Sequence, residues 1–197
     1  MAKVLLLFAH PALEKSRIHK SLIREVNDLE GILFHDLYEL YPDFDIDVKK
    51  EQQLLLQHDI IIFQHPFYWY SAPALIKQWQ DLVLEHNWAY GSKGKMLSGK
   101  TSFNIISCGG SREAYSKEGR NRYSIKELMA PFDQTAVLCN MKYWPPFVIH
   151  GTHRLTNNEI KGYTKQYRDL LLLVRDGSPA VDHITYLNEL VSLPELI

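Results

Sequence analysis

KVLLLFAHPALEKSRIHKSLIREVNDLEG, residues 3–31, contains the change in hydrophobic pattern that decides the fold. Residues 4–9 are an unbroken apolar run, which predicts a strand buried on both faces. Residues 17–29 carry apolar side chains at spacings of three and four positions, so they predict an amphipathic helix that ends before Gly31. A buried strand that leads into a helix is typical of a parallel sheet with helical crossovers.

The same alternation of strand and helix continues along the chain. Four more strands are predicted at residues 32–37, 59–64, 101–107 and 135–141, the last continuing toward His150. Helices are predicted at residues 49–57, 73–84, 122–132 and 157–175, and residues 38–48 are predicted to be a loop. We therefore expect an α/β, flavodoxin-like, doubly wound fold: a five-stranded parallel sheet in the order 2-1-3-4-5 with helices on both faces.

Length and composition indicate one globular domain. The chain has 197 residues; we expect the flavodoxin-like domain at residues 1–177 and a tail at residues 178–197 that can form a short helix. A net charge of −1 argues against nucleic-acid binding, and no apolar stretch is long enough to span a bilayer. Because no secretion signal is recognisable, Cys108 and Cys139 indicate free thiols and a cytoplasmic location.

Three chemically unusual segments, residues 10–19, 65–71 and 107–115, each follow a predicted strand directly. In a doubly wound sheet, ligands bind outside the carboxyl ends of the strands, where the strand order reverses. The first, third and fourth strands are neighbours at that point. The three segments are therefore expected to converge on one ligand site.

The first segment, HPALEKSRIH, has the composition of an anion site. Ser16 and Arg17 stand at a predicted helix start, where free backbone N–H groups favour a phosphate, and His10 adds a donor. The segment lacks a glycine fingerprint, so a capped helix beside a surface histidine is an equal alternative.

The second segment contains four consecutive aromatic residues, 67–70. Neighbouring side chains cannot all point into one core, so some must be exposed unless a flat apolar group covers them. A flavin ring meets that need, and a tyrosine- and tryptophan-rich dimer interface is the alternative. Both can hold.

The third segment, SCGGSREAY, offers close backbone approach to a ligand at Gly109 and Gly110. Their N–H groups can stabilise negative charge on the edge of a flavin ring, although a plain turn is the simpler explanation for two glycines. Cys108 is either redox-active or merely buried. No metal site is expected, because the nine histidines lack ligand spacing beside carboxylates, and no Walker sequence is present.

Longer segments carry a resemblance to a known family. KVLLLFAHP, HDLYELYPDFDIDVKKEQ, DIIIFQHPFYWYSAPALIKQW and NRY are the most specific of them, within a match from residue 3 to about residue 177. The chain resembles the flavodoxin-like NAD(P)H:quinone reductases, and especially the Kef-type (KefG-like) ancillary proteins of glutathione-regulated potassium efflux systems.

The resemblance implies a bound flavin, FMN or alternatively FAD, with NAD(P)H as co-substrate. It implies cofactor contacts from three sets of residues: His10, Ser16, Arg17, Ile18 and His19 at the phosphate; Pro66, Phe67, Tyr68 and Trp69 at the ring; Ser107, Cys108, Gly109 and Gly110 at the ring edge. Tyr115 matches a tyrosine near the reacting ring, and Asn121 or a neighbour stands where relatives carry its partner histidine. The resemblance also implies a homodimer with the site at the subunit interface.

Two functions of different classes remain open at this stage. The first is a flavin-dependent NAD(P)H oxidoreductase of the quinone-reductase type, in which hydride passes from NAD(P)H to a quinone-like acceptor. The second is a regulatory subunit that binds the cytoplasmic part of a potassium/proton antiporter at the inner face of the membrane. Residues 38–48 and 178–197 are its expected docking segments, although core packing or a dimer contact explains residues 178–197 equally well. A one-electron carrier is less favoured, because such carriers usually dock through an acidic face.

Overall fold

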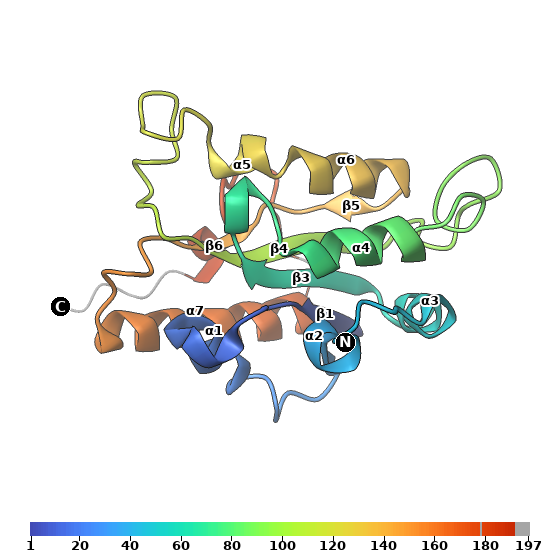
Figure 1. Cartoon of the computed structure of the whole chain (residues 1–197), viewed down its shortest axis with the longest axis horizontal. Coiled ribbons are helices and arrows are strands. Elements are labelled where there is room, and N and C mark those ends of the chain that lie inside the picture. Colours follow the sequence, from blue (N-terminus) through green and yellow to red (C-terminus); the bar gives the residue numbers. More distant parts are fainter. Residues whose placement is uncertain (178, 192–197) are drawn as a thin grey trace.

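The computed structural model describes residues 1–177 and 179–191, and its centre is a parallel sheet (Figure 1). The strands are β1 (Val4–Phe8), β2 (Ile32–Asp36), β3 (Ile60–Pro66), β4 (Thr101–Ser107), β5 (Lys142–Tyr143) and β6 (Phe147–Ile149). Their order is β2-β1-β3-β4-β5, and β6 pairs with β4 as well. Since β5 and β6 pair with successive parts of β4, they share the fifth strand position. The predicted flavodoxin-like order is therefore confirmed.

Seven α-helices and three short 3-10 helices are found among the described residues. The α-helices are α1 (Arg17–Ile23), α2 (Leu37–Leu40), α3 (Val48–Gln57), α4 (Ala74–Val83), α5 (Ile125–Leu128), α6 (Ala130–Leu138) and α7 (Asn157–Asp176). The 3-10 helices are η1 (Leu13–Lys15), η2 (Tyr68–Tyr70) and η3 (Leu187–Val191). None of these described helices combines the length and the apolar character that crossing a bilayer requires.

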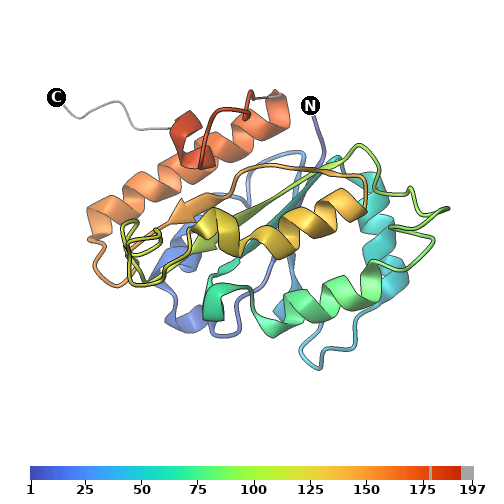
Figure 2. The same ribbon diagram turned by 90° about the horizontal axis from the view of Figure 1, so that it is seen from above.

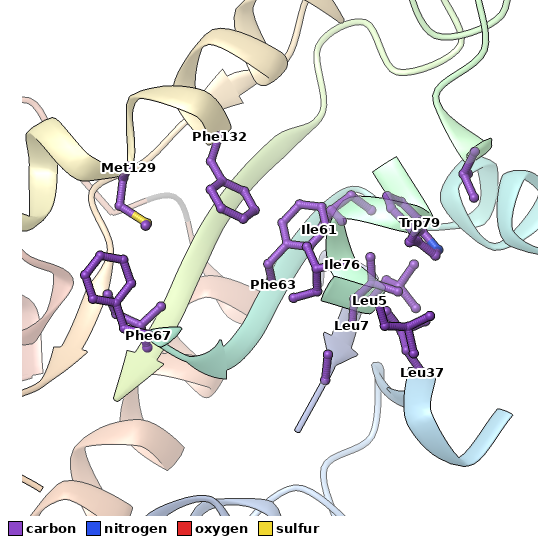
Figure 3. Packing of buried hydrophobic residues seen from close by; sticks show 14 of the residues in the cluster. Leu5, Leu7, Leu37, Ile61, Phe63, Phe67, Ile76, Trp79, Met129 and Phe132 are labelled. Carbon is purple, nitrogen blue, oxygen red and sulfur yellow. The ribbon is translucent and has the colours of Figure 1, made fainter. Parts of the chain in front are cut away.

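Helices cover both faces of the sheet (Figures 1 and 2). Alternate residues of β1 point to opposite faces: Leu5 packs in the cluster shared with α3, α4 and α6, and Leu6 packs in the cluster shared with α1 and α7. Figure 3 shows the first cluster, in which Phe63 lies between Trp79 and Phe132 with ring centroids 5.7 and 5.5 Å away. The central strands β1 and β3 are buried along their whole length and β4 along nearly all of it, as expected for a parallel sheet covered on both faces.

A buried carboxylate links three elements on the first face. Glu51 of α3 is fully buried and accepts hydrogen bonds from His35 Nε2 at 2.8 Å, the Tyr41 hydroxyl at 2.6 Å and Trp79 Nε1 at 2.8 Å. Burial opposes ionisation, but these three donors outweigh it and lower the pKa of Glu51. The segment after β2, predicted to be a loop, is thereby held on the core and contains α2.

The prediction of a strand at residues 135–141 is wrong, because residues 130–138 form α6. This segment is apolar on most sides, so its periodicity does not separate helix from strand. Pro131 in the first turn is the signal that favoured a helix. The fifth strand position begins only at Lys142 and is divided by Pro145 and Pro146, which cannot donate to a ladder.

Two helix predictions needed new boundaries. The helix predicted at residues 17–29 ends at Ile23, and turns continue to residue 28 while Val26 and Leu29 stay buried. The helix predicted at residues 122–132 begins at Ile125, after the Ser124 capping box, and is divided at Met129. Apolar spacing survives in buried turns, so it overstates helix length.

The C-terminal segment packs back onto the edge of the sheet. Leu187 is fully buried, and its N–H donates to the Pro146 carbonyl at 3.0 Å. The Asn188 amide pairs with both backbone groups of Val148, at 2.8 and 3.1 Å, as a neighbouring strand would. Residues 178 and 192–197 of the predicted tail lie outside the described residues.

Candidate functional site

The three unusual segments meet at the carboxyl ends of β1, β3 and β4. They line a cavity of about 480 Å³, here called cavity A, which lies within the range of small-molecule sites. Its lining consists of His10, Ala12, Lys15, Ser16, Arg17, Ile18, Pro66, Phe67, Tyr68, Ser107, Gly109, Thr152 and His153. Residues distant in sequence are thus brought together where the sheet topology predicts a ligand site.

A second cavity of about 540 Å³, here called cavity B, adjoins cavity A. Its lining consists of Phe67, Trp69, Tyr70, Gly109, Gly110, Ser111, Ala114, Tyr115, Arg120, Asn121, Gly151, His153 and Arg154. The two cavities share Phe67, Gly109 and His153. A ligand in cavity A would therefore present one end to cavity B.

Hydrogen-bond donors surround the β1 end of cavity A. His10 Nδ1 accepts the Ala12 N–H at 3.2 Å, so the proton of the neutral ring resides on Nε2. Burial lowers the pKa of His10, which favours that neutral form. Ser16 is the N-cap of α1: its oxygen accepts the His19 N–H at 3.1 Å, and its hydroxyl proton stays free to donate.

Arg17, Ile18 and Lys15 also line this end of cavity A. One guanidinium nitrogen of Arg17, Nη2, donates to the Leu155 carbonyl at 3.1 Å and to Asn157 Oδ1 at 3.0 Å. These bonds hold the arginine at the rim and leave its other N–H groups available.

His19 lies beneath cavity A rather than on its lining. It is fully buried, and burial lowers its pKa well below the usual value, so the ring is neutral. Its Nδ1 lies 3.4 Å from the Gln64 amide nitrogen, and its Nε2 lies 2.9 Å from Ser107 Oγ. Gln64 in turn accepts the Tyr167 hydroxyl at 2.7 Å.

The hydrogen bonds in this chain of buried groups all donate the same way, from Tyr167 through Gln64 and His19 to Ser107. The Gln64 amide N–H donates to Nδ1 of His19, which places the ring proton on Nε2 and directs it to Ser107 Oγ. Ser107 Oγ is then an acceptor on the protein side, so its own proton is free to donate into cavity A. The predicted role of His19 as a direct phosphate contact remains a prediction, and its position favours orienting Ser107.

The aromatic segment separates its side chains between core and surface. Phe67 is 7% exposed, and its N–H donates to the Ser107 carbonyl at 2.8 Å. Trp69 is 93% exposed and has φ of 50°, and Tyr70 follows with φ of 62°. Two consecutive non-glycine residues in the left-handed region are strained, and such strain concentrates at functional sites.

At Gly109 and Gly110, two ring side chains come close to the backbone. A Cβ at Gly109 would lie 2.8 Å from His153 Nε2, and one at Gly110 would lie 2.8 Å from Cε2 of Tyr115. The glycines let both rings close over the backbone. The Gly110 carbonyl also accepts the Gly151 N–H at 2.9 Å, which joins this segment to the loop after β6.

Cys108 is on the lining of neither cavity. Burial raises its pKa to about 12, so it is a neutral thiol. Its Sγ lies 3.3 Å from His150 Nδ1, and its S–H donates to the Gly110 carbonyl at 3.6 Å. A structural position beneath the glycines is what this geometry supports.

Tyr115 and Asn121, the two predicted catalytic residues, both line cavity B. Tyr115 is buried against Phe67, with ring centroids 5.9 Å apart, and burial raises the pKa of its hydroxyl. Asn121 Oδ1 accepts the Tyr70 hydroxyl at 3.3 Å, which joins the second segment to the loop that follows the third segment. Their catalytic roles remain predictions.

The loop after β6 is part of the site and was missed by the sequence analysis. Gly151, Thr152, His153 and Arg154 line one or both cavities. The signal was available, because the carboxyl end of a fifth strand belongs to the same edge of the sheet. The predicted site rested on three chemically unusual segments, and residues 151–154 were not among them. Within the described part of the chain, no group of three or more His, Cys, Asp or Glu side chains could hold a metal ion.

Comparisons with known proteins match the same part of the chain. A family profile described as "Flavodoxin-like fold" matches residues 2–171. The chain is 44% identical over 169 residues to an NAD(P)H oxidoreductase of Bacillus subtilis, YrkL, covering 86% of this chain and 97% of that protein. It is 41% identical over 169 residues to the glutathione-regulated potassium-efflux ancillary protein KefG of Pectobacterium carotovorum, covering 86% of this chain and 92% of that one.

A solved structure shares this architecture. The crystal structure of general stress protein 14 from Treponema denticola in complex with FMN superposes with a TM-score of 0.82 at 38% identity, covering 86% of this chain and 97% of that chain. Residues 2–171 include the whole lining of cavities A and B.

Proposed function

The chain belongs to the flavodoxin-like fold family, and from that premise we propose that it is an FMN-dependent NAD(P)H oxidoreductase of the quinone-reductase type. The observation that carries the proposal is the pair of adjoining cavities: one end of cavity A holds cationic and hydroxyl donors, and its other end opens beside aromatic residues into cavity B. The FMN complex of a relative with 38% identity supports FMN over FAD.

The residues of cavity A fit a phosphate-bearing flavin. Lys15, Arg17, Ser16 and the Nε2–H of His10 would hold the phosphate, because all are donors and no carboxylate lines the cavity. The backbone N–H groups in the first turn of α1 add donors that have no partner inside the helix. Ile18 contributes through its backbone.

The flat end of the cofactor would lie against Pro66, Phe67 and Tyr68, with Trp69 at its exposed side. The Ser107 hydroxyl and the backbone of Gly109 and Gly110 would hold the ring edge. Cys108 would act from beneath, by keeping these glycines in place. The bound FMN would supply the redox chemistry, in which a hydride is accepted from NAD(P)H and passed to a quinone-like acceptor.

Cavity B would receive NAD(P)H and then the acceptor in turn. Tyr115 and Asn121 would orient each substrate beside the ring, and a buried tyrosine with a raised pKa stays protonated as a hydrogen-bond donor. Phe67 and Tyr115 would exclude water from one side. Positioning of this kind is the main contribution that a protein makes to hydride transfer.

The exposed aromatic residues support a homodimer as the working form. Tyr68, Trp69 and Tyr70 are 41%, 93% and 50% exposed, and such side chains are enriched at protein interfaces. Because Trp69 and Tyr70 also line cavity B, a partner subunit packed on them would close the substrate site.

A second candidate function rests on the KefG relatives. The protein would bind the cytoplasmic part of a potassium efflux antiporter and would be held at the inner face of the membrane through that partner. The docking prediction for residues 38–48 concerns a segment whose Tyr41 and Ile46 are buried and whose exposed residues include Leu40 and several acidic side chains.

Steady-state oxidation of NADPH and NADH by a soluble quinone tests the enzyme proposal and separates it from the antiporter proposal. We expect turnover in the FMN-loaded wild type and its loss in Trp69→Ala. Potassium efflux measured with the same variant then reports on activation alone. FMN-loaded protein that oxidises neither dinucleotide with any quinone would contradict the enzyme proposal.

A further inference from the structure

The lining of cavity B carries positive charge, and a flavin phosphate bound in cavity A would not neutralise it. Arg120 and Arg154 line it, and no aspartate or glutamate does. Among the described residues, neither arginine forms an ion pair. The chain as a whole has a net charge of −1, so this is a local concentration of positive charge.

Backbone hydrogen bonds fix the two loops that carry these arginines. Beside Arg120, the N–H of Asn121 donates to the Ala114 carbonyl at 3.0 Å, which folds the segment back on itself. A Cβ at Gly119 would lie 2.2 Å from the Glu113 carbonyl oxygen, so this fold requires glycine there.

The second arginine is placed by a turn in the loop after β6. The Arg154 N–H donates to the Gly151 carbonyl at 2.8 Å, and Gly151 has φ of 65°. Because the Gly151 N–H is bonded to the Gly110 carbonyl, this turn is fixed to the glycine segment, of which Gly109 lines both cavities. The two arginines approach cavity B from two loops that are joined to each other.

FMN has a single phosphate, and cavity A already offers Lys15, Arg17 and Ser16 for it. Arg120 and Arg154 line cavity B alone, so they are left for another anion. A guanidinium binds phosphate oxygens in a bidentate geometry, and the dinucleotide donor brings phosphates to the cavity that must receive it.

We propose that Arg120 and Arg154 bind the phosphate groups of the pyridine-dinucleotide donor and determine the affinity of cavity B for it. This inference rests on the proposed oxidoreductase function. The phosphates concerned are either the diphosphate common to NADH and NADPH or the 2′-phosphate of NADPH, and these two sources respond differently to loss of the arginines.

The test compares Arg120→Gln and Arg154→Gln with the wild type and with Arg24→Gln. Arg24 is an exposed arginine at the end of α1 that lines neither cavity, so it is the matched control. KM is measured for NADH and NADPH, and binding of NAD⁺ and NADP⁺ to the FMN-loaded protein is measured by calorimetry. Flavin content of each variant is measured by absorbance.

We expect both site variants to keep their flavin. Their affinity for the dinucleotide should fall about tenfold, which is the loss expected when one charge-assisted hydrogen-bonded contact is removed. Equal losses for the two dinucleotides identify the diphosphate. A loss confined to NADP⁺ and NADPH identifies the 2′-phosphate and makes the protein selective for NADPH.

Two results would overturn this inference alone. One is a wild type that turns over while both arginine variants keep the KM and the affinities of Arg24→Gln. The other is a turning-over wild type in which Arg24→Gln loses as much as the site variants, because the effect would then be one of overall charge. A wild type that takes up no FMN and oxidises no dinucleotide would instead refute the proposed function.

Discussion

The hydroxyl of Ser107 is oriented by a histidine whose charge does not change near neutral pH. Because burial keeps His19 neutral and Gln64 donates to its Nδ1, the Nε2 proton is committed to Ser107. Ser107 can then donate only toward cavity A. At the scale of single residues, the buried groups behind the lining determine what the lining offers to a ligand.

Ser107→Ala is expected to weaken FMN binding by about three- to tenfold, which corresponds to loss of one hydrogen bond of ~0.5–1.5 kcal/mol. The variant also leaves the Nε2–H of His19 without its acceptor, so the free energy of unfolding should fall by about 1–3 kcal/mol. Fluorescence titration with FMN and urea denaturation measure the two effects. Ser102→Ala, a buried serine at the other end of β4, is the control and should bind FMN as the wild type does.

Cys108 should be unreactive in the folded protein. With a pKa raised to about 12 by burial, roughly one thiol in ten thousand is ionised at about pH 8, and the thiolate is the reactive form. A chromogenic disulfide reagent added to Cys139→Ala, which isolates Cys108, should react only after urea is added. Rapid reaction under native conditions would reveal a thiolate and reopen a redox role for this residue.

Single residues also show which features of the site could be predicted from the sequence and which could not. Ser16 and Ser107 both line cavity A, because each stands at the end of an element whose position the hydrophobic pattern predicts, and their contact with a flavin stays a prediction. The depth of His19 was not predictable, and burial of Cys108 was only one of two open alternatives, because burial of a side chain next to a loop depends on packing from distant elements such as α7.

At the scale of elements, Glu51 joins β2, α3 and α4 through one carboxylate with three donors. Glu51→Leu would remove the acceptor shared by His35, Tyr41 and Trp79 and leave these groups buried without a partner. We expect the free energy of unfolding to fall by about 3–5 kcal/mol, as when one partner of a buried polar network is deleted. Urea denaturation measures the loss.

Gln53→Ala is the matched control, since Gln53 is an exposed residue of the same helix and should change stability by no more than about 0.5 kcal/mol. A loss below about 1 kcal/mol in Glu51→Leu would show that the carboxylate network does not stabilise the folded state.

The order and type of most elements were predictable, because buried strands and amphipathic helices leave different apolar periods. The exception is residues 130–141, where α6 exposes Val137 and Leu138 and so lacks a polar face. A helix of this kind has no period to detect. The loop of His153 and Arg154 follows this fifth strand position, and the predicted site included only the segments after the first, third and fourth strands.

At the scale of the whole molecule, stability should depend on acid pH through buried histidines. Burial lowers the pKa of His65 to about 4, and burial together with Arg112 lowers that of His150 to about 4. In the unfolded chain both would titrate at about 6.5. Below about pH 6.5 the unfolded state therefore binds more protons than the folded state, and the free energy of unfolding falls as the pH drops toward about 4.

Each of these histidines contributes a slope of at most about 1.4 kcal/mol per pH unit in this window. Urea denaturation at about pH 7, about pH 5.5 and about pH 4.5 measures the slope, which should be smaller in His65→Gln. A free energy of unfolding that is the same at all three pH values would contradict the conclusion that these histidines are held neutral in the folded protein.

The whole molecule also explains why the site itself was predictable. Each of the three segments alone is a weak indication of a ligand site. Together they indicate one site, because a parallel sheet brings the ends of its first, third and fourth strands to one edge. What the sequence could not show is how the segments are joined, for example by the bond from Gly151 to Gly110, because such bonds depend on loop conformation.

Titration of flavin-free protein with FMN and, separately, with riboflavin tests the central claim most directly. The two ligands share the ring, and only FMN has the phosphate that Lys15, Arg17, Ser16 and His10 are proposed to hold. We predict one FMN bound per chain, with riboflavin binding weaker by about tenfold or more, since charge-assisted bonds to phosphate would be missing. No binding of FMN, or equal affinity for FMN and riboflavin, would contradict the account.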